Sequence, residues 1–122
     1  MSGMTAAVEF VRTDAREVLR VPVEALYFEP SGYEPSVSEA AIRRFEQARG
    51  PLSDDAAVRR ATLSGLEMGA LFRAGNRRIF VARPDGGWER REVRIGGEDE
   101  THVEIVSGPL EPGEPVILAE RG

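Results

Sequence analysis

The sequence predicts a mainly β chain with an α-helical insert, an α+β fold whose strands form a small antiparallel roll or barrel. Three observations lead to this fold class. Apolar and charged residues alternate near both ends of the chain, as in half-buried strands. Clusters of Gly and Pro separate these short runs, as in sheets whose strands are joined by tight turns. The middle of the chain instead has apolar residues at helical spacing.

The N-terminal part predicts two strands, at residues 5–11 and 17–23, because β-branched and aromatic residues are frequent in both. Pro22 has no N–H group to donate, so we expect the second strand to lie at a sheet edge or to end near this residue. Residues 24–28 are expected to continue in an extended conformation.

The pattern then changes to a helical one. Residues 36–49 predict a helix, with apolar residues on one side and a Gly-Pro pair after its end. Ser36 has capping-box spacing to Glu39, and Ser38 is an alternative N-cap. A second helix is expected after the following Ser-Asp-Asp sequence, because acidic residues suit the positive end of a helix dipole. Residues 66–73 fit either a helix end or a strand. The sequence thus predicts one or two helices between the second and third strands.

The C-terminal block predicts four further strands, at residues 78–83, 88–95, 101–106 and 116–119. A Pro-Asp-Gly-Gly sequence between the first two predicts a hairpin turn. The expected buried residues are Val93, Ile95, Val103, Ile105 and Val116. Four short strands make a thin sheet, so we expect the strands from the two ends of the chain to be neighbours.

The composition excludes several classes of function. The chain has 122 residues and a formal net charge of −5, so it lacks the positive charge that nucleic-acid binding requires. It has no Cys and one His, which excludes disulfides, thiolate nucleophiles and Cys-based zinc sites. No apolar run approaches the roughly 20 residues of a membrane span, and residues 1–10 lack the features of a signal peptide.

No catalytic, cofactor-binding or metal site is predicted. His102 is close in sequence to the acidic residues at positions 98, 99, 100 and 104. A cation site or a pH switch is conceivable there, but an acidic turn of this kind is usually just solvated. The adjacent acids Asp54 and Asp55 are better explained as partners of a helix dipole than as a general acid/base pair. We therefore expect a protein that is not an enzyme.

Two stretches, residues 3–28 and 76–120, carry a more specific pattern. The first reads GMTAAV, then EVLRVP and AL; the second reads FV, REVRIG, VEIVSG and EPGEPV. In this order the runs resemble those of the periplasmic adaptor proteins, or membrane fusion proteins, of tripartite efflux pumps. The sequences of these runs are most similar to those of the adaptors of macrolide-type ABC exporters. Two features depart from the family pattern: Pro109 is inserted after a Gly, and residues 29–74 have no counterpart.

The resemblance implies a division of the chain into three parts. Residues 1–28 would be the end of a β-barrel domain and the entry strands of a membrane-proximal domain. Residues 29–75 would be a helical insert, and residues 76–122 the C-terminal strands of the membrane-proximal domain. The chain would then be a non-enzymatic fragment of an adaptor that couples an inner-membrane exporter to an outer-membrane channel, for the export of drugs or other small molecules. Its location would be periplasmic, anchored to the inner membrane through a preceding part.

Adaptors of this family generally work as rings, so the resemblance also implies homo-oligomers. We expect two copies of this chain to pair or to swap strands at an open sheet edge. No cofactor and no nucleic-acid partner is expected.

The insert supplies candidate contacts with a transporter or with a second copy, because Arg and aromatic residues are favoured at interface anchors. The candidates are Tyr33, Arg43, Arg44, Phe45, Arg59, Arg60 and Phe72. In the alternative, the apolar residues of the insert cover the sheet, with Ile42, Phe45, Val58 and Leu63 as core. A second function also stays open: a stand-alone module that binds a small molecule or a protein in a pocket between insert and sheet.

Overall fold

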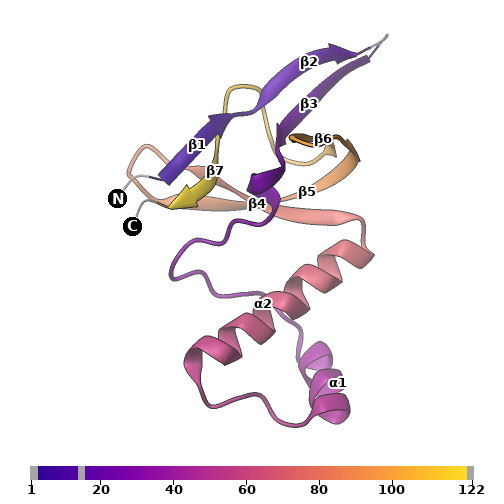
Figure 1. The fold of residues 1–122 in the computed structure, drawn as a ribbon, viewed down its shortest axis with the longest axis vertical. Coiled ribbons are helices and arrows are strands. Elements are labelled where there is room, and N and C mark those ends of the chain that lie inside the picture. Colours follow the sequence, from indigo (N-terminus) through magenta and orange to yellow (C-terminus); the bar gives the residue numbers. More distant parts are fainter. Residues whose placement is uncertain (1–2, 14–15, 121–122) are drawn as a thin grey trace. The chain divides into compact units, whose positions relative to one another are not determined.

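The computed structural model describes residues 3–13 and 16–120, in two compact units. The first unit combines Met1–Ser31 with Gly75–Gly122, and the second is Gly32–Ala74. In the described part of the chain, the first unit contains the strands and the second contains the two α-helices (Figure 1). The prediction of a mainly antiparallel β chain with helices is therefore confirmed.

The first unit is one open sheet of seven antiparallel strands in the order β1-β7-β4-β5-β6-β3-β2. The strands are β1 (Gly3–Ala7), β2 (Glu9–Thr13), β3 (Arg16–Pro22), β4 (Asn76–Ala82), β5 (Trp88–Glu98), β6 (His102–Ser107) and β7 (Pro115–Glu120). Strands from the two ends of the chain are neighbours, as predicted: β1 pairs with β7, and β3 with β6. Strand β3 ends at Pro22, also as expected.

The two edge strands, β1 and β2, are consecutive in the chain and are separated by Val8 alone. The Val8 N–H donates to the Glu114 carbonyl at 2.8 Å, and the Val8 carbonyl accepts from the Gly113 N–H at 2.9 Å. The stretch predicted as one strand at residues 5–11 therefore pairs with β7 before Val8 and with β3 after it. The structure therefore has three strands before the helices, where the prediction had two. The predicted place of the helices, between the second and third strands, is corrected to between the third and fourth.

The hydrophobic core of the first unit consists mainly of β-branched residues from five strands and their neighbours. Its buried members are Val8, Val21, Ala25, Leu26, Ile79, Val81, Val93, Val103, Ile105, Leu110 and Val116. Four of the five residues expected to be buried are in this set, and Ile95 packs against it while partly exposed. The alternation of residues along the strands was thus a sound guide to the core.

A short 3₁₀ helix, η1 (Val23–Leu26), lies where an extended continuation was expected. It follows Pro22, whose backbone is still extended, and it places the adjacent residues Ala25 and Leu26 in the core. In a strand, two successive side chains would point to opposite faces of the sheet. The 3₁₀ turn is what allows both to be buried.

The loop between β6 and β7 folds back over the core. The Leu110 N–H donates to the Gly108 carbonyl at 2.9 Å, which makes a three-residue turn centred on Pro109. The ring of Pro fixes φ near the value that an inverse γ-turn requires at its centre. Pro109 therefore has a structural role, since this turn brings Leu110 into the core.

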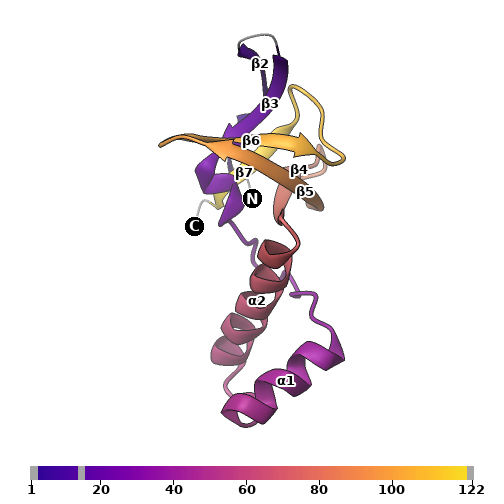
Figure 2. The same ribbon diagram turned by 90° about the vertical axis from the view of Figure 1, so that its right-hand side faces the viewer.

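The second unit contains α1 (Glu39–Arg49) and α2 (Ala56–Arg73), joined by a short connection (Figure 2). The N-cap of α1 is Ser38, whose hydroxyl accepts a hydrogen bond from a backbone N–H, so the alternative cap replaces Ser36. The Asp55 carboxylate caps α2 in the same way. Residues 66–73, which fitted a helix or a strand, are the last turns of α2. Neither of these helices has the length and apolar character needed to cross a membrane.

Candidate functional site

The candidate contact residues of the insert are mostly accessible. Arg43 and Arg44 are exposed on α1, and Arg59 and Arg60 are exposed on α2. Phe72, in the last turn of α2, has 65% of its surface exposed. Phe72 shares this exposure with two aromatic residues of the first unit, Phe10 at 53% and Tyr27 at 68%.

The four apolar residues expected as core of the insert are half-buried or exposed. Phe45 and Ile42 are half-buried on α1, a helix that has no buried residue at all. On α2, Leu63 is half-buried, and Val58 has 52% of its surface exposed. None of the four residues named in the alternative role is therefore buried in the structure.

Tyr33 differs from the other candidates because it is buried, with 4% of its surface exposed. Its hydroxyl donates to the Glu67 carboxylate at 2.5 Å, and Glu67 is 2% exposed. A hydrogen bond to a charged acceptor is short and strong, particularly in a site of low dielectric. Tyr33 thus fixes the segment before α1 to the middle of α2 within the second unit. The sequence alone gave no sign that Glu67 would be buried.

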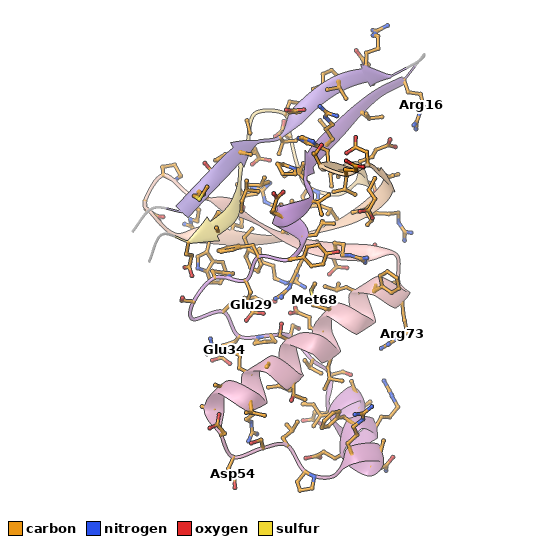
Figure 3. All side chains as sticks on the ribbon, viewed as in Figure 1. Arg16, Glu29, Glu34, Asp54, Met68 and Arg73 are labelled. Atoms are coloured by element: carbon orange, nitrogen blue, oxygen red, sulfur yellow. The ribbon has the colours of Figure 1, made fainter. Side chains whose placement is uncertain are left out.

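Charged residues lie at both ends of α2. Asp54 precedes its N-terminus and Arg73 ends its last turn, as Figure 3 shows. Arg59, Arg60 and Phe72 are exposed as well, the two arginines in the first turns of α2 and Phe72 in its last turn. The exposed positions are therefore spread along the length of the helix.

The first unit contains a buried cation that the sequence analysis missed. Arg78 on β4 is 2% exposed, and its guanidinium donates to the Glu29 carboxylate at 2.9 Å. The guanidinium also lies 5.6 Å from the centre of the Phe80 ring, within cation–π range. A buried Arg is tolerated only when its charge is paired, so Arg78 anchors the segment that contains Glu29 to the sheet.

A second ionic group, the Arg91 cluster, consists of Arg91, Glu89, Glu114 and the Pro109 carbonyl. Arg91 donates to both oxygens of Glu114, at 2.8 and 2.9 Å, to Glu89, and to the Pro109 carbonyl at 2.6 Å. The hydrogen bonds that Arg91 donates to Glu114 hold the pKa of Glu114 below its usual value, and the same bonds raise the pKa of Arg91. The cluster binds β5 to the loop that covers the core.

His102 lies in a third polar group with Glu9, Arg20 and Asp99. The Arg20 guanidinium donates to Glu9 at 2.7 Å, and this bond lowers the pKa of the Glu9 carboxyl. Backbone N–H groups of Thr101 and His102 donate to Asp99 and lower the pKa of that carboxyl. The carboxylates therefore have partners within the fold. Across residues 3–13 and 16–120, no three His, Asp or Glu side chains converge to hold a metal ion.

Comparison with known proteins adds no family or fold relative. No protein-family model matches the chain, and neither does any curated protein or solved structure with which it was compared.

Proposed function

We propose that the chain is the membrane-proximal part of a periplasmic adaptor, without enzymatic activity, that couples an inner-membrane exporter to an outer-membrane channel. One observation carries the proposal. The stretches that resemble the adaptor family, residues 3–28 and 76–120, are far apart in the chain, yet they pair in a single sheet, β1 with β7 and β3 with β6. Both stretches therefore belong to one folded unit, as a membrane-proximal domain requires.

The mechanism in this proposal is mechanical coupling. The sheet would sit on the periplasmic face of the exporter and transmit its conformational change to the barrel and hairpin that precede it in an adaptor. The continuity of the two edge strands through Val8 supports the roll-like curvature of a membrane-proximal domain. The exposed face of α2 would bind the exporter or a neighbouring copy in the ring.

The decisive experiment follows the natural gene product in its own cells. The cells are separated into cytoplasmic, periplasmic and membrane fractions. Antibodies raised against residues 1–122 then detect the product in each fraction by immunoblot. We expect the product at the inner membrane, where protease added to the periplasm can cleave it. A short cross-linker that does not react with amines should join it to an exporter subunit, which mass spectrometry would identify. Recovery in the cytoplasmic fraction alone would refute the proposal.

The contact surface can be tested residue by residue with a photo-cross-linking amino acid. Benzoylphenylalanine placed at Phe72 is expected to give cross-links to the exporter or to a second copy. The matched control is Tyr27, an aromatic residue of the first unit with 68% of its surface exposed. Because the sheet is itself proposed to face the exporter, Tyr27 reports on the first unit. Absence of cross-links from Phe72 alone would remove α2 from the proposed interface.

Self-association of the chain is also part of the proposal. Strands β1 and β2 are the edges of the sheet, and an edge strand offers unpaired backbone groups to another chain. We expect light scattering to show a molar mass that rises from one copy toward two or more as the concentration increases. A mass equal to one copy at every concentration would contradict this part of the proposal.

A further inference from the structure

A pocket of about 450 Å³ opens on the first unit, away from the hydrophobic core. Its lining comes from both ends of the chain and from the β4–β5 hairpin. Three of the lining residues are glycines, at positions 3, 86 and 87, so no side chain from these positions fills the space. The volume is within the range of sites that bind small molecules, roughly 300 to 1,000 Å³.

The apolar wall of the pocket is rigid. Phe28 and Ile117 are 9% and 7% exposed, and Pro30 is fully buried. The Phe80 ring lies behind this wall and packs edge-to-face against both Phe28 and Trp88, with centroid distances of 5.9 and 5.4 Å. Edge-to-face contacts favour this arrangement of the rings, so a ligand would meet an apolar surface that is already formed.

The rim of the pocket carries one carboxylate whose charge is not neutralised within the described residues. Glu120 accepts hydrogen bonds from the Ser31 N–H and hydroxyl, the latter at 2.9 Å, and both donors are neutral. The other charged lining residue, Arg83, has its own partner in Asp85 at 3.6 Å. The rim therefore offers a fixed negative charge next to aromatic side chains, an arrangement that favours cations.

From these observations we infer that the pocket binds small amphipathic cations, with an apolar ring body against Phe28, Trp88 and Ile117 and a positive head group at Glu120. This site does not depend on the adaptor proposal. A chain that binds no exporter can still bind such a ligand, and an adaptor without the pocket can still couple its partners.

The test uses three probes that share a naphthalene ring and differ in the charge of the head group: 1-naphthylmethylammonium, 1-naphthalenemethanol and 1-naphthoate. Trp88 is the single Trp of the chain, so its indole N–H gives one resolved signal in a ¹H–¹⁵N correlation spectrum. We expect this signal to shift on titration with the ammonium probe, with a dissociation constant on the order of a millimolar for a ligand of about 12 non-hydrogen atoms. The alcohol should bind more weakly and the carboxylate weakest.

Two variants separate the apolar and the electrostatic parts of the site. Thr5→Phe places a ring in the pocket and should abolish the shift for every probe. Glu120→Gln keeps an oxygen that can accept from Ser31 but removes the charge. It should weaken binding of the ammonium probe by about fivefold and leave binding of the alcohol unchanged. The matched control Glu100→Gln removes an exposed carboxylate that does not line the pocket and should change neither.

Thr5 and Glu120 are both exposed, and the same spectra report whether each variant is folded. An indole signal that does not move with any probe overturns the pocket. Binding of all three probes with equal affinity, unchanged in Glu120→Gln, overturns the assignment to cations.

Discussion

Replacing Arg91 by Met tests whether the Arg91 cluster holds the β6–β7 loop over the core. The guanidinium makes five hydrogen bonds of 2.6 to 2.9 Å, to Glu89, Glu114 and the Pro109 carbonyl. Met keeps a long, flexible stem of similar size but has no donor. The substitution therefore removes the hydrogen bonds while preserving most of the packing.

The expected loss follows from the exposure of the partners. A hydrogen bond to a charged group stabilises a fold by about 1.5–3 kcal/mol, whereas breaking a fully buried ion pair costs about 3–5 kcal/mol. The side chains of Arg91 and Glu114 are 18% and 26% exposed, so water can replace part of what is lost. We therefore expect the free energy of unfolding to fall by about 2 kcal/mol, or the melting temperature by roughly 7 °C for a chain of this size.

The assay is urea unfolding followed by the fluorescence of Trp88, which lies on the same strand as Arg91. The control is Arg83→Met, because Arg83 makes one exposed contact of 3.6 Å and should change stability by less than about 0.5 kcal/mol. A double-mutant cycle with Glu114→Gln should give a coupling energy of about 1 kcal/mol or more. An Arg91→Met variant as stable as Arg83→Met would refute the role assigned to the cluster.

Three further predictions concern single interactions. The pKa of Glu114 is lowered in the folded state, so its contribution to stability is complete above its unfolded pKa of about 4.3 and is lost as the pH falls through the lower folded value. The difference in stability between the natural chain and Glu114→Gln should therefore vanish in unfolding experiments near pH 2 to 3. A difference that stays constant with pH would contradict this. Gly108 has φ 134°, and a Cβ there would lie 2.9 Å from the Val93 side chain. Gly108→Ala should therefore lower the free energy of unfolding in urea by about 2 kcal/mol or more. Gly97→Ala, whose Cβ would meet nothing within 4 Å, should leave it nearly unchanged. Tyr33→Phe removes one hydrogen bond to the buried Glu67 side chain and should destabilise the second unit by about 1 kcal/mol, measured by the loss of helical circular dichroism on heating. An unchanged transition would show that this hydrogen bond is dispensable.

Elements with strong local signals could be predicted from the sequence. The Pro-Asp-Gly-Gly turn is present: the Arg83 N–H donates to the Gly87 carbonyl at 2.9 Å, and Gly86 has the positive φ of 89° that favours glycine. The four C-terminal strands and the two capped helices followed in the same way from alternation and from cap residues. Such signals are local, because a turn or a cap depends on a few neighbouring residues.

What the sequence could not provide depends on contacts between distant residues. The pairs Arg78–Glu29 and Tyr33–Glu67 join residues 49 and 34 positions apart, and nothing near Arg78 or Glu67 distinguishes it from an exposed charge. The pocket beside Trp88 is formed by segments from both ends of the chain and has no motif. The change of partner at Val8 was missed for the same reason, since it depends on β7 and β3, which lie elsewhere in the chain.

The position of Val8 has a consequence for how the sheet opens. Edge strands usually fray independently of one another, because each is held along one side only. Here both edges belong to one extended segment. The N–H of the residue between them donates to the Glu114 carbonyl, and its carbonyl accepts from the Gly113 N–H. Separation of β1 from β7 therefore pulls on β2 through a single peptide unit. Amide hydrogen exchange at the two edges should then follow one shared opening event, whose frequency is set by a buried valine and the loop that binds it.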